Sequence, residues 1–124
     1  MRTTTLFRNS TEFQTFHPGD IVFKAGDPGD CMYVIKEGEV DLLIEGKALA
    51  TLGEGEVFGE MAIVDSKPRS ATAVAKTNCQ LVPVNEKRFN FLVQQTPYFA
   101  IFLIQVLADR LRGMDEKFRS PAAN

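Results

Sequence analysis

Glycine-containing turns divide the first half of the chain into short segments, and this spacing limits the fold more than any other feature. Between residues 18 and 59 such turns recur every six to nine positions, and Pro18-Gly19-Asp20 and Pro28-Gly29-Asp30 are near-identical turn signals. Several short strands at this spacing predict a compact antiparallel barrel or sandwich. The strand-like runs are 12–16, 21–24, 31–36, 39–44, 48–52, 71–76 and 79–84.

Two of the turns are short enough to be hairpin turns, Glu37-Gly38 and Glu45-Gly46-Lys47. Between them Val40, Leu42 and Ile44 occupy alternate positions, which is typical of a partly buried strand with one face toward solvent.

The hydrophobic pattern changes at Asn85, which is suited to cap a helix at its N-terminus. Pro97 separates that helix from a longer one, expected at about 98–118, and a loose tail is expected at 120–124. Gly113 weakens the expectation that the long helix is continuous. Apolar residues in it recur at steps of three and four over about two heptads. This seam comprises Ile104, Leu107, Leu111, Met114 and Phe118.

Length and charge bound the class of protein. The 124 residues fit one domain, 1–124, and the net charge of -2 gives no general attraction to nucleic acid. The sequence has no apolar run long enough for a membrane span and no signal-peptide pattern at its start, so we expect a cytoplasmic protein. Cys31 and Cys79 are expected to be buried free thiols, and His17, the only histidine, has no second histidine with which to build a metal or catalytic site.

The segment Phe58–Thr72, F-G-E-M-A-I-V-D-S-K-P-R-S-A-T, combines groups that suit an anion with a neighbouring hydroxyl. Gly59-Glu60-Met61-Ala62 is suited to begin a helix, whose first N–H groups have no partner within the helix. Arg69 follows Glu60 by nine residues, and its guanidinium suits bidentate contact with a phosphate. Proline stiffens the turn before Arg69, and Ser70 adds a hydroxyl and an N–H. We expect a phosphate on Arg69 and the amides, and a hydroxyl on Glu60.

This segment resembles the phosphate-binding cassette of the cyclic nucleotide-binding domain family, because F-G-E-x-A, the nine-residue spacing, P-R-S and A-T coincide. The resemblance covers about residues 13–112 and includes G-D-P-G-D at 26–30 and Y-V-I-K-E-G-E-V at 33–40. It implies a mainly β fold, an antiparallel eight-stranded, jelly-roll-like β-roll with a short cassette helix and two C-terminal helices. The β-roll would occupy about 12–84 and the C-terminal helices about 85–118.

The resemblance also implies the ligand and its contacts. Arg69 would hold the cyclic phosphate and Glu60 would accept a hydrogen bond from the ribose 2′-hydroxyl, with cAMP favoured over cGMP and no cofactor. The implied ligand-binding residues are Phe58, Gly59, Glu60, Met61, Ala62, Arg69, Ser70 and Ala71. In bacterial regulators of this family the long helix covers the base, which makes Arg110, Leu111 and Met114 candidate lid residues, with ordinary helix packing or dimer contact as the alternative.

Two departures from the family pattern affect the expected output. Only about a dozen residues precede the first strand, so an N-terminal relay element is expected to be short or missing. The given sequence ends at Asn124 without a helix-turn-helix, kinase or channel domain, so we expect a stand-alone receptor that signals by rearranging its C-terminal helices, with a domain of a longer parent chain as the alternative. The expected partners are a second copy through the long helix and an unidentified downstream protein.

Other classes explain the sequence less well. An enzyme would draw on carboxylates such as Glu54 and Asp65, but the usual metal or nucleophile signature is lacking, so no catalytic or metal-binding residue is predicted. The sensor part of a transcription regulator of the cAMP receptor protein type shares these features. From Asp109 to Arg119, however, cations are interspersed with acidic residues, which does not favour direct DNA binding. The remaining alternatives are a β-roll interaction module without ligand and a surface turn in which Arg69 and Glu60 pair with each other.

Overall fold

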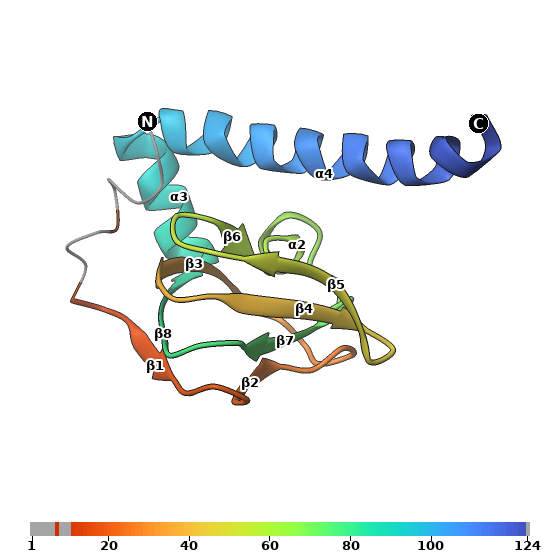
Figure 1. Cartoon of the computed structure of the whole chain (residues 1–124). Coiled ribbons are helices and arrows are strands. Elements are labelled where there is room, and N and C mark those ends of the chain that lie inside the picture. The colour runs from red at the N-terminus through yellow and green to blue at the C-terminus, as the bar shows by residue number, and fades with distance from the viewer. Residues whose placement is uncertain (1–6, 8–10, 124) are drawn as a thin grey trace.

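The computed structural model describes Phe7 and residues 11–123, with side chains up to Gly113. Figure 1 shows a roll of short strands with a long helix along one side of it. The elements in chain order are β1 (Gln14–Phe16), β2 (Ile21–Phe23), β3 (Cys31–Glu37), β4 (Val40–Ile44), β5 (Lys47–Leu52), β6 (Val57–Phe58), α2 (Met61–Val64), β7 (Thr72–Ala75), β8 (Cys79–Asn85), α3 (Glu86–Gln95) and α4 (Tyr98–Ala123).

The strands form two four-stranded antiparallel sheets, in the orders β1-β8-β3-β6 and β2-β7-β4-β5. The expected hairpin at Glu45-Gly46 is confirmed, because Ile44 pairs with Lys47 across a two-residue loop. Both loop residues have positive φ, 51° at Glu45 and 78° at Gly46, which is the conformation of a tight hairpin turn.

Three local expectations were wrong. Glu37-Gly38 is not a hairpin turn, because β3 and β4 belong to different sheets and the chain crosses between them there. The two-residue strand β6 was missed, since Val57 and Phe58 are too short a run to show a period. Helix α4 continues to Ala123, beyond the expected end at 118 and through most of the expected tail, and Gly113 does not interrupt it.

Two apolar clusters hold the roll and its helices together. One lies between the sheets and includes Phe23, Ile35 and Phe58. The other lies on the outer side of the β3–β8 sheet, where Val34 and Val82 pack against Phe99 and Leu103 of α4. Helices α3 and α4 are therefore anchored to the sheet by apolar contacts, and α4 passes close to β5, β6 and α2 in Figure 1.

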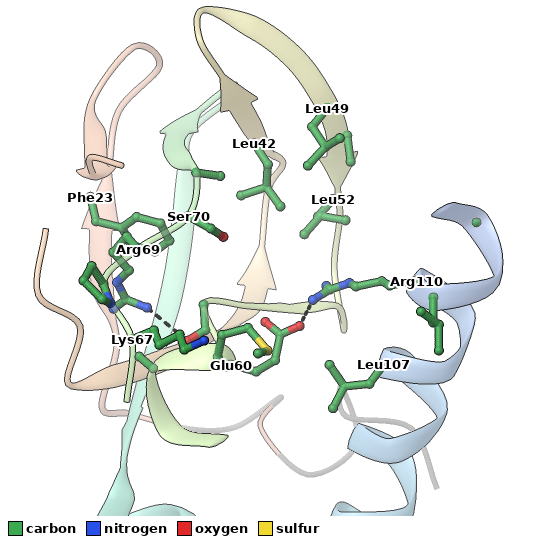
Figure 2. Close-up of a pocket in the computed structure, with 18 residues that line it drawn as sticks. Phe23, Leu42, Leu49, Leu52, Glu60, Lys67, Arg69, Ser70, Leu107 and Arg110 are labelled. Carbon is green, nitrogen blue, oxygen red and sulfur yellow. Dashed lines mark hydrogen bonds and ion pairs between the residues drawn. The ribbon is translucent and has the colours of Figure 1, made fainter. Parts of the chain in front are cut away.

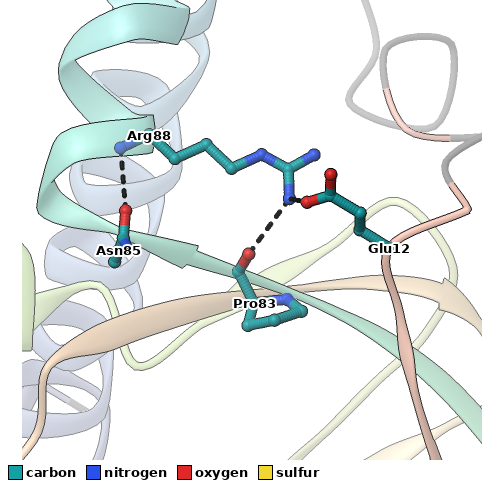
Figure 3. A network of polar contacts seen from close by, with 4 residues as sticks. All are labelled: Glu12, Pro83, Asn85 and Arg88. Carbon is teal, nitrogen blue, oxygen red and sulfur yellow. Dashed lines mark hydrogen bonds and ion pairs between the residues drawn. The ribbon is translucent and has the colours of Figure 1, made fainter.

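The segment before β1 also contacts the helices. Phe7 is buried against Phe99 with a T-shaped ring contact at 6.2 Å. Arg88 of α3 pairs with Glu12 at 3.3 Å and donates to the Pro83 carbonyl (Figure 3). Its guanidinium also lies over the Phe7 ring. The expectation of a short or missing N-terminal relay element falls mainly on residues 1–6 and 8–10, which lie outside the described residues.

Candidate functional site

A cavity of about 590 Å³ lies between the cassette segment, the β4–β5 hairpin and α4. Its polar side chains come from 60–70 and from Arg110, and its apolar wall comes from β2, β4, β5 and α4. Figure 2 shows Arg69 on one side and Arg110 on the other, with Glu60 between them. The structure therefore brings together the two residues that the sequence singled out, Glu60 and Arg69, at one cavity.

Arg69 is the most unusual side chain of the site. It is only 8% exposed, although arginine is rarely buried without a counter-ion. Its Nη1 donates to the Gly59 carbonyl at 3.0 Å, its Nη2 donates to the Cys31 carbonyl at 2.7 Å, and the guanidinium stacks 4.0 Å from the Phe23 ring centroid. Its Nε is buried and has no hydrogen-bond partner among the described residues. The partners that hold the guanidinium are neutral, and none of the acidic side chains that the structure describes forms an ion pair with it.

Two glycines make room for this guanidinium. A Cβ on Gly59 would lie 2.6 Å from Nη1 of Arg69, and the φ of +74° at Gly59 is one that other residues rarely adopt. A Cβ on Gly29 would lie 2.8 Å from Nε of Arg69 and from the Ala62 side chain. The turn that the sequence showed at Pro28-Gly29-Asp30 therefore also has a packing role at the site.

Glu60 is the second buried charged group of the site, at 4% exposure. It lies two residues after the end of β6 and is the N-cap residue of α2, without a side-chain capping bond, so its carboxylate is available to other groups. That carboxylate forms an ion pair with Arg110 of α4, whose guanidinium also donates to the Val57 carbonyl. Burial lowers the pKa of Arg110, and nearby Glu56 opposes this shift. The alternative in which Glu60 pairs with Arg69 is not observed.

The rest of the cavity wall is mainly aliphatic. The sequence analysis did not assign most of these residues to a site, because their periodicity shows that they lie in strands or a helix but not which cavity they face. On the β4–β5 side of Figure 2, Leu42, Leu49 and Leu52 lie together, opposite Leu107 of α4. The missed lining residues are Phe23, Leu42, Leu49, Ala50, Leu52, Lys67, Pro68, Leu107 and Gly113.

The other predicted site residues fall into three groups. Met61, Ala62, Ser70 and Ala71 line the cavity with Gly59, Glu60 and Arg69. Phe58 does not line it but is fully buried behind it, 5.8 Å from the Phe23 ring. Of the candidate lid residues, Arg110 and Leu111 line the cavity, and the side chain of Met114 lies outside the described part of the chain.

Other features of the described residues bear on the site's class. Cys31 and Cys79 are buried free thiols, as expected. Burial and a hydrogen bond with Cys31 raise the pKa of Tyr33 to about 12, so its phenol stays protonated beneath Arg69.

Among residues 11–113 and Phe7, no group of three or more metal-ligating side chains gathers. No single described helix has the length and apolar content to cross a membrane. Within the described part of the chain, α3 and residues 98–113 meet both criteria only when taken together, and the two helices are bent by 115° relative to each other.

Comparison with known proteins places this geometry in a family. Residues 13–96 match the family model described as cyclic nucleotide-binding domain. The chain is 36% identical over 102 residues to the cyclic AMP receptor protein of Thermus thermophilus, covering 78% of this chain and 47% of that one. It is 36% identical over 85 residues to the cAMP-dependent protein kinase regulatory subunit of Eremothecium gossypii, covering 68% of this chain and 19% of that one.

A solved structure supports the same family assignment. The catabolite activator protein of Thermus thermophilus superposes with a TM-score of 0.76 at 35% identity, over 86% of this chain and 53% of that one. The predicted β-roll fold is therefore confirmed. The chain spans less than half the length of the two curated relatives named above.

Proposed function

The chain belongs to the cyclic nucleotide-binding domain family, and from this we propose that it is a cytoplasmic cAMP receptor that binds its ligand without turning it over. The proposal rests on Arg69, a buried cation that pairs with no acidic side chain in the described part of the chain, and on the buried carboxylate of Glu60, which lines the same cavity. A cyclic phosphate would supply the missing negative charge, and Nε of Arg69 is a donor still to be satisfied. Glu60 would accept a hydrogen bond from the ribose 2′-hydroxyl.

The aliphatic wall supports cAMP over cGMP. The base would lie among Leu42, Leu49, Leu52, Leu107 and Leu111, none of which offers a hydrogen bond. Guanine carries more polar groups on its edge than adenine does, and each buried polar group without a partner costs about 1–3 kcal/mol. Adenine would therefore be less costly to bury in this cavity.

Arg110 provides a route from the ligand to α4. Its ion pair with Glu60 links the long helix to the carboxylate that we assign to the ribose. A ligand that adds a hydrogen bond to Glu60 changes the free energy of this pair, and so favours one position of α4 over another. We propose that this change in α4 is the signal passed to a downstream protein or to a second copy of the chain.

Calorimetric titration with cAMP tests the assignment. Each charge-assisted hydrogen bond contributes about 1.5–3 kcal/mol, so Arg69→Ala should weaken binding by about 100-fold or more. Arg69→Lys keeps the charge but loses the planar fork, and should recover only part of the affinity. Arg112→Ala, which removes an exposed cation paired with Asp109, is the matched control. Equal cAMP affinity in Arg69→Ala and the parent protein would overturn the proposal.

The same titration with 2′-deoxy-cAMP tests the role of Glu60. The deoxy ligand leaves the buried carboxylate without its hydroxyl partner, so the parent protein should bind it less tightly than cAMP. The difference between the two ligands should shrink in Glu60→Gln. If the parent protein binds both ligands equally, Glu60 does not contact the ribose.

A further inference from the structure

Met61 places an oxidisable sulfur at the wall of the cavity. It is the first residue of α2, it follows Glu60 directly, and it is 44% exposed. Met32, by contrast, is fully buried in β3 with an exposure of 0%. Thioether oxidation depends on access of the oxidant to the sulfur, so these two methionines should differ strongly in reactivity.

We propose that Met61 is a reversible oxidation site that controls ligand affinity, an inference that rests on the proposed cAMP-binding function. A hydroperoxide transfers one oxygen atom to the thioether, which is oxidised to the sulfoxide. The peroxide O–O bond breaks, and the peroxide is reduced to water or an alcohol. Methionine sulfoxide reductases return the sulfoxide to the thioether, so the change is reversible.

The surroundings of Met61 explain why the added oxygen would matter. Met61 shares the cavity with the Glu60 carboxylate and with the aliphatic wall, which contains Leu107. The sulfoxide turns an apolar contact surface into a polar one that carries a strong hydrogen-bond acceptor. That acceptor has no donor to meet in the aliphatic wall, and it adds negative potential to a cavity that would hold an anion. Both effects oppose the binding of a cyclic nucleotide.

A bound ligand should in turn protect the sulfur. A nucleotide in contact with Arg69 and Glu60 would occupy the cavity that Met61 lines, and would limit the access of an oxidant from that side. Peroxide would then reach the sulfur more slowly in the liganded receptor than in the unliganded one, because the thioether is oxidised only where the oxidant has access to it. Oxidative inactivation would therefore act on the unliganded receptor.

Peptide mapping by mass spectrometry combined with cAMP titration tests the proposal. The purified full chain is treated with hydrogen peroxide, with and without saturating cAMP, and then with dithiothreitol to reverse thiol oxidation. We expect Met61 to oxidise much faster than Met32 and cAMP to slow the oxidation of Met61. We expect peroxide to weaken cAMP binding of the parent protein by about tenfold, and reductases for both sulfoxide epimers to restore it.

Met61→Leu isolates the sulfur, because leucine keeps an apolar side chain that hydroperoxides do not oxidise. The readout is the ratio of its affinities before and after peroxide, which should stay near one whatever its starting affinity. This comparison also removes contributions from Met1 and Met114, which remain in the variant.

Three results would overturn the inference: a Met61 sulfoxide that binds cAMP as tightly as the thioether, an equal loss of affinity in Met61→Leu, or no protection of Met61 by cAMP. Failure of the untreated parent protein to bind cAMP would instead overturn the proposed function, and this inference with it.

Discussion

At the scale of single residues, the site depends on small residues that let a guanidinium approach the backbone. Arg69 donates to carbonyls of two other segments, and this position is available only because Gly59 and Gly29 lack a Cβ. Gly29 is the more useful of the two for a test. The backbone conformation of Gly29 is one that other residues also adopt, so a substitution there is opposed only by the contacts that the new side chain would make.

We predict that Gly29→Ala weakens cAMP binding by about tenfold or more, because the new Cβ meets Arg69 Nε and Ala62 Cβ at 2.8 Å and displaces the guanidinium. Gly53→Ala is the matched control, since a Cβ at Gly53 meets nothing within 4 Å. Calorimetric titration of both variants measures the effect, and thermal unfolding checks that both are folded. A Gly29→Ala protein that folds and binds cAMP like Gly53→Ala would show that the guanidinium has room to shift without loss.

The sequence predicted the principal charged residues of the site but not their partners. Glu60 and Arg69 lie in one short segment with a distinctive spacing, so local pattern was enough. The pairing of Glu60 with Arg110 joins residues fifty positions apart. Nothing in the local pattern around Arg110 distinguishes a cation that faces a cavity from one on a solvated helix face, and so its partner could not be predicted.

At the scale of elements, the start of α3 fixes how the helical part leaves the roll. Asn85 is the last residue of β8 and the N-cap of α3, and its side-chain oxygen accepts a hydrogen bond from the Arg88 backbone N–H at 2.8 Å. The Arg88 side chain in turn contacts Pro83 and Glu12. Figure 3 shows these contacts joining the strand, the helix and the N-terminal segment.

We predict that Asn85→Ala lowers the free energy of unfolding by about 1 kcal/mol, because the first turn of α3 loses the acceptor that satisfies one of its N–H groups. Asn85→Asp and Asn85→Ser keep a side-chain acceptor and should retain most of the stability. Urea unfolding followed by circular dichroism measures all three. A loss in Asn85→Ser as large as in Asn85→Ala would attribute the effect to packing rather than to capping.

Elements with a strong local signal were predicted closely, and those held by distant contacts were not. The cap at Asn85 and the paired positive φ angles at Glu45 and Gly46 follow from side-chain and turn chemistry within a few residues. Strand β6 exists because Val57 and Phe58 pair with Val34 and Tyr33 of β3, which no local pattern shows. The crossing at Gly38 also depends on a distant part of the chain. The backbone there passes so close to Asn78 that a Cβ on Gly38 would lie 2.3 Å from the Asn78 carbonyl oxygen.

At the scale of the whole molecule, α4 is linked to the roll in two ways. Its first half packs through Phe99 and Leu103 against the sheet, and farther along Arg110 pairs with Glu60 and donates to Val57. The first contact is apolar and does not involve the cavity. The second involves the carboxylate that we assign to the ligand, and is therefore the contact through which ligand and helix can be coupled.

We predict that Arg110→Ala uncouples α4 from the ligand. In the parent protein, cAMP should slow amide hydrogen exchange in residues 104–113, because the ligand strengthens the contacts around Glu60. In Arg110→Ala this protection should be largely lost while that of the cassette segment remains. Arg112→Ala, whose side chain pairs with Asp109 on the same helix, serves as the control. Equal protection of 104–113 in all three proteins would exclude Arg110 as the coupling residue.

The apolar seam of α4 divides between two environments, and this bears on the predicted dimer. Leu107 and Leu111 line the cavity, although Leu111 is still 68% exposed, whereas Ile104 is 64% exposed and does not line it. The side chains of Met114 and Phe118 lie outside the described part of the chain. Ile101 adds a third exposed apolar residue at 49%. Ile101, Ile104 and Leu111 follow one another at steps of three and seven, which places them on one helix face.

We predict weak dimerisation through this face of α4. Burying an exposed isoleucine or leucine contributes about 1.5–3 kcal/mol, and three such residues from each copy have to offset the entropy of association. Binding of cAMP should strengthen the dimer, because holding Arg110 on Glu60 orders the helix that carries these side chains. Sedimentation of the free and cAMP-saturated protein measures the association. Ile104→Glu should abolish it and should bind cAMP with the affinity of the parent protein diluted to the monomer, because dimerisation and cAMP binding are coupled. Monomers at high micromolar concentration in both states would show that α4 signals to a different protein instead.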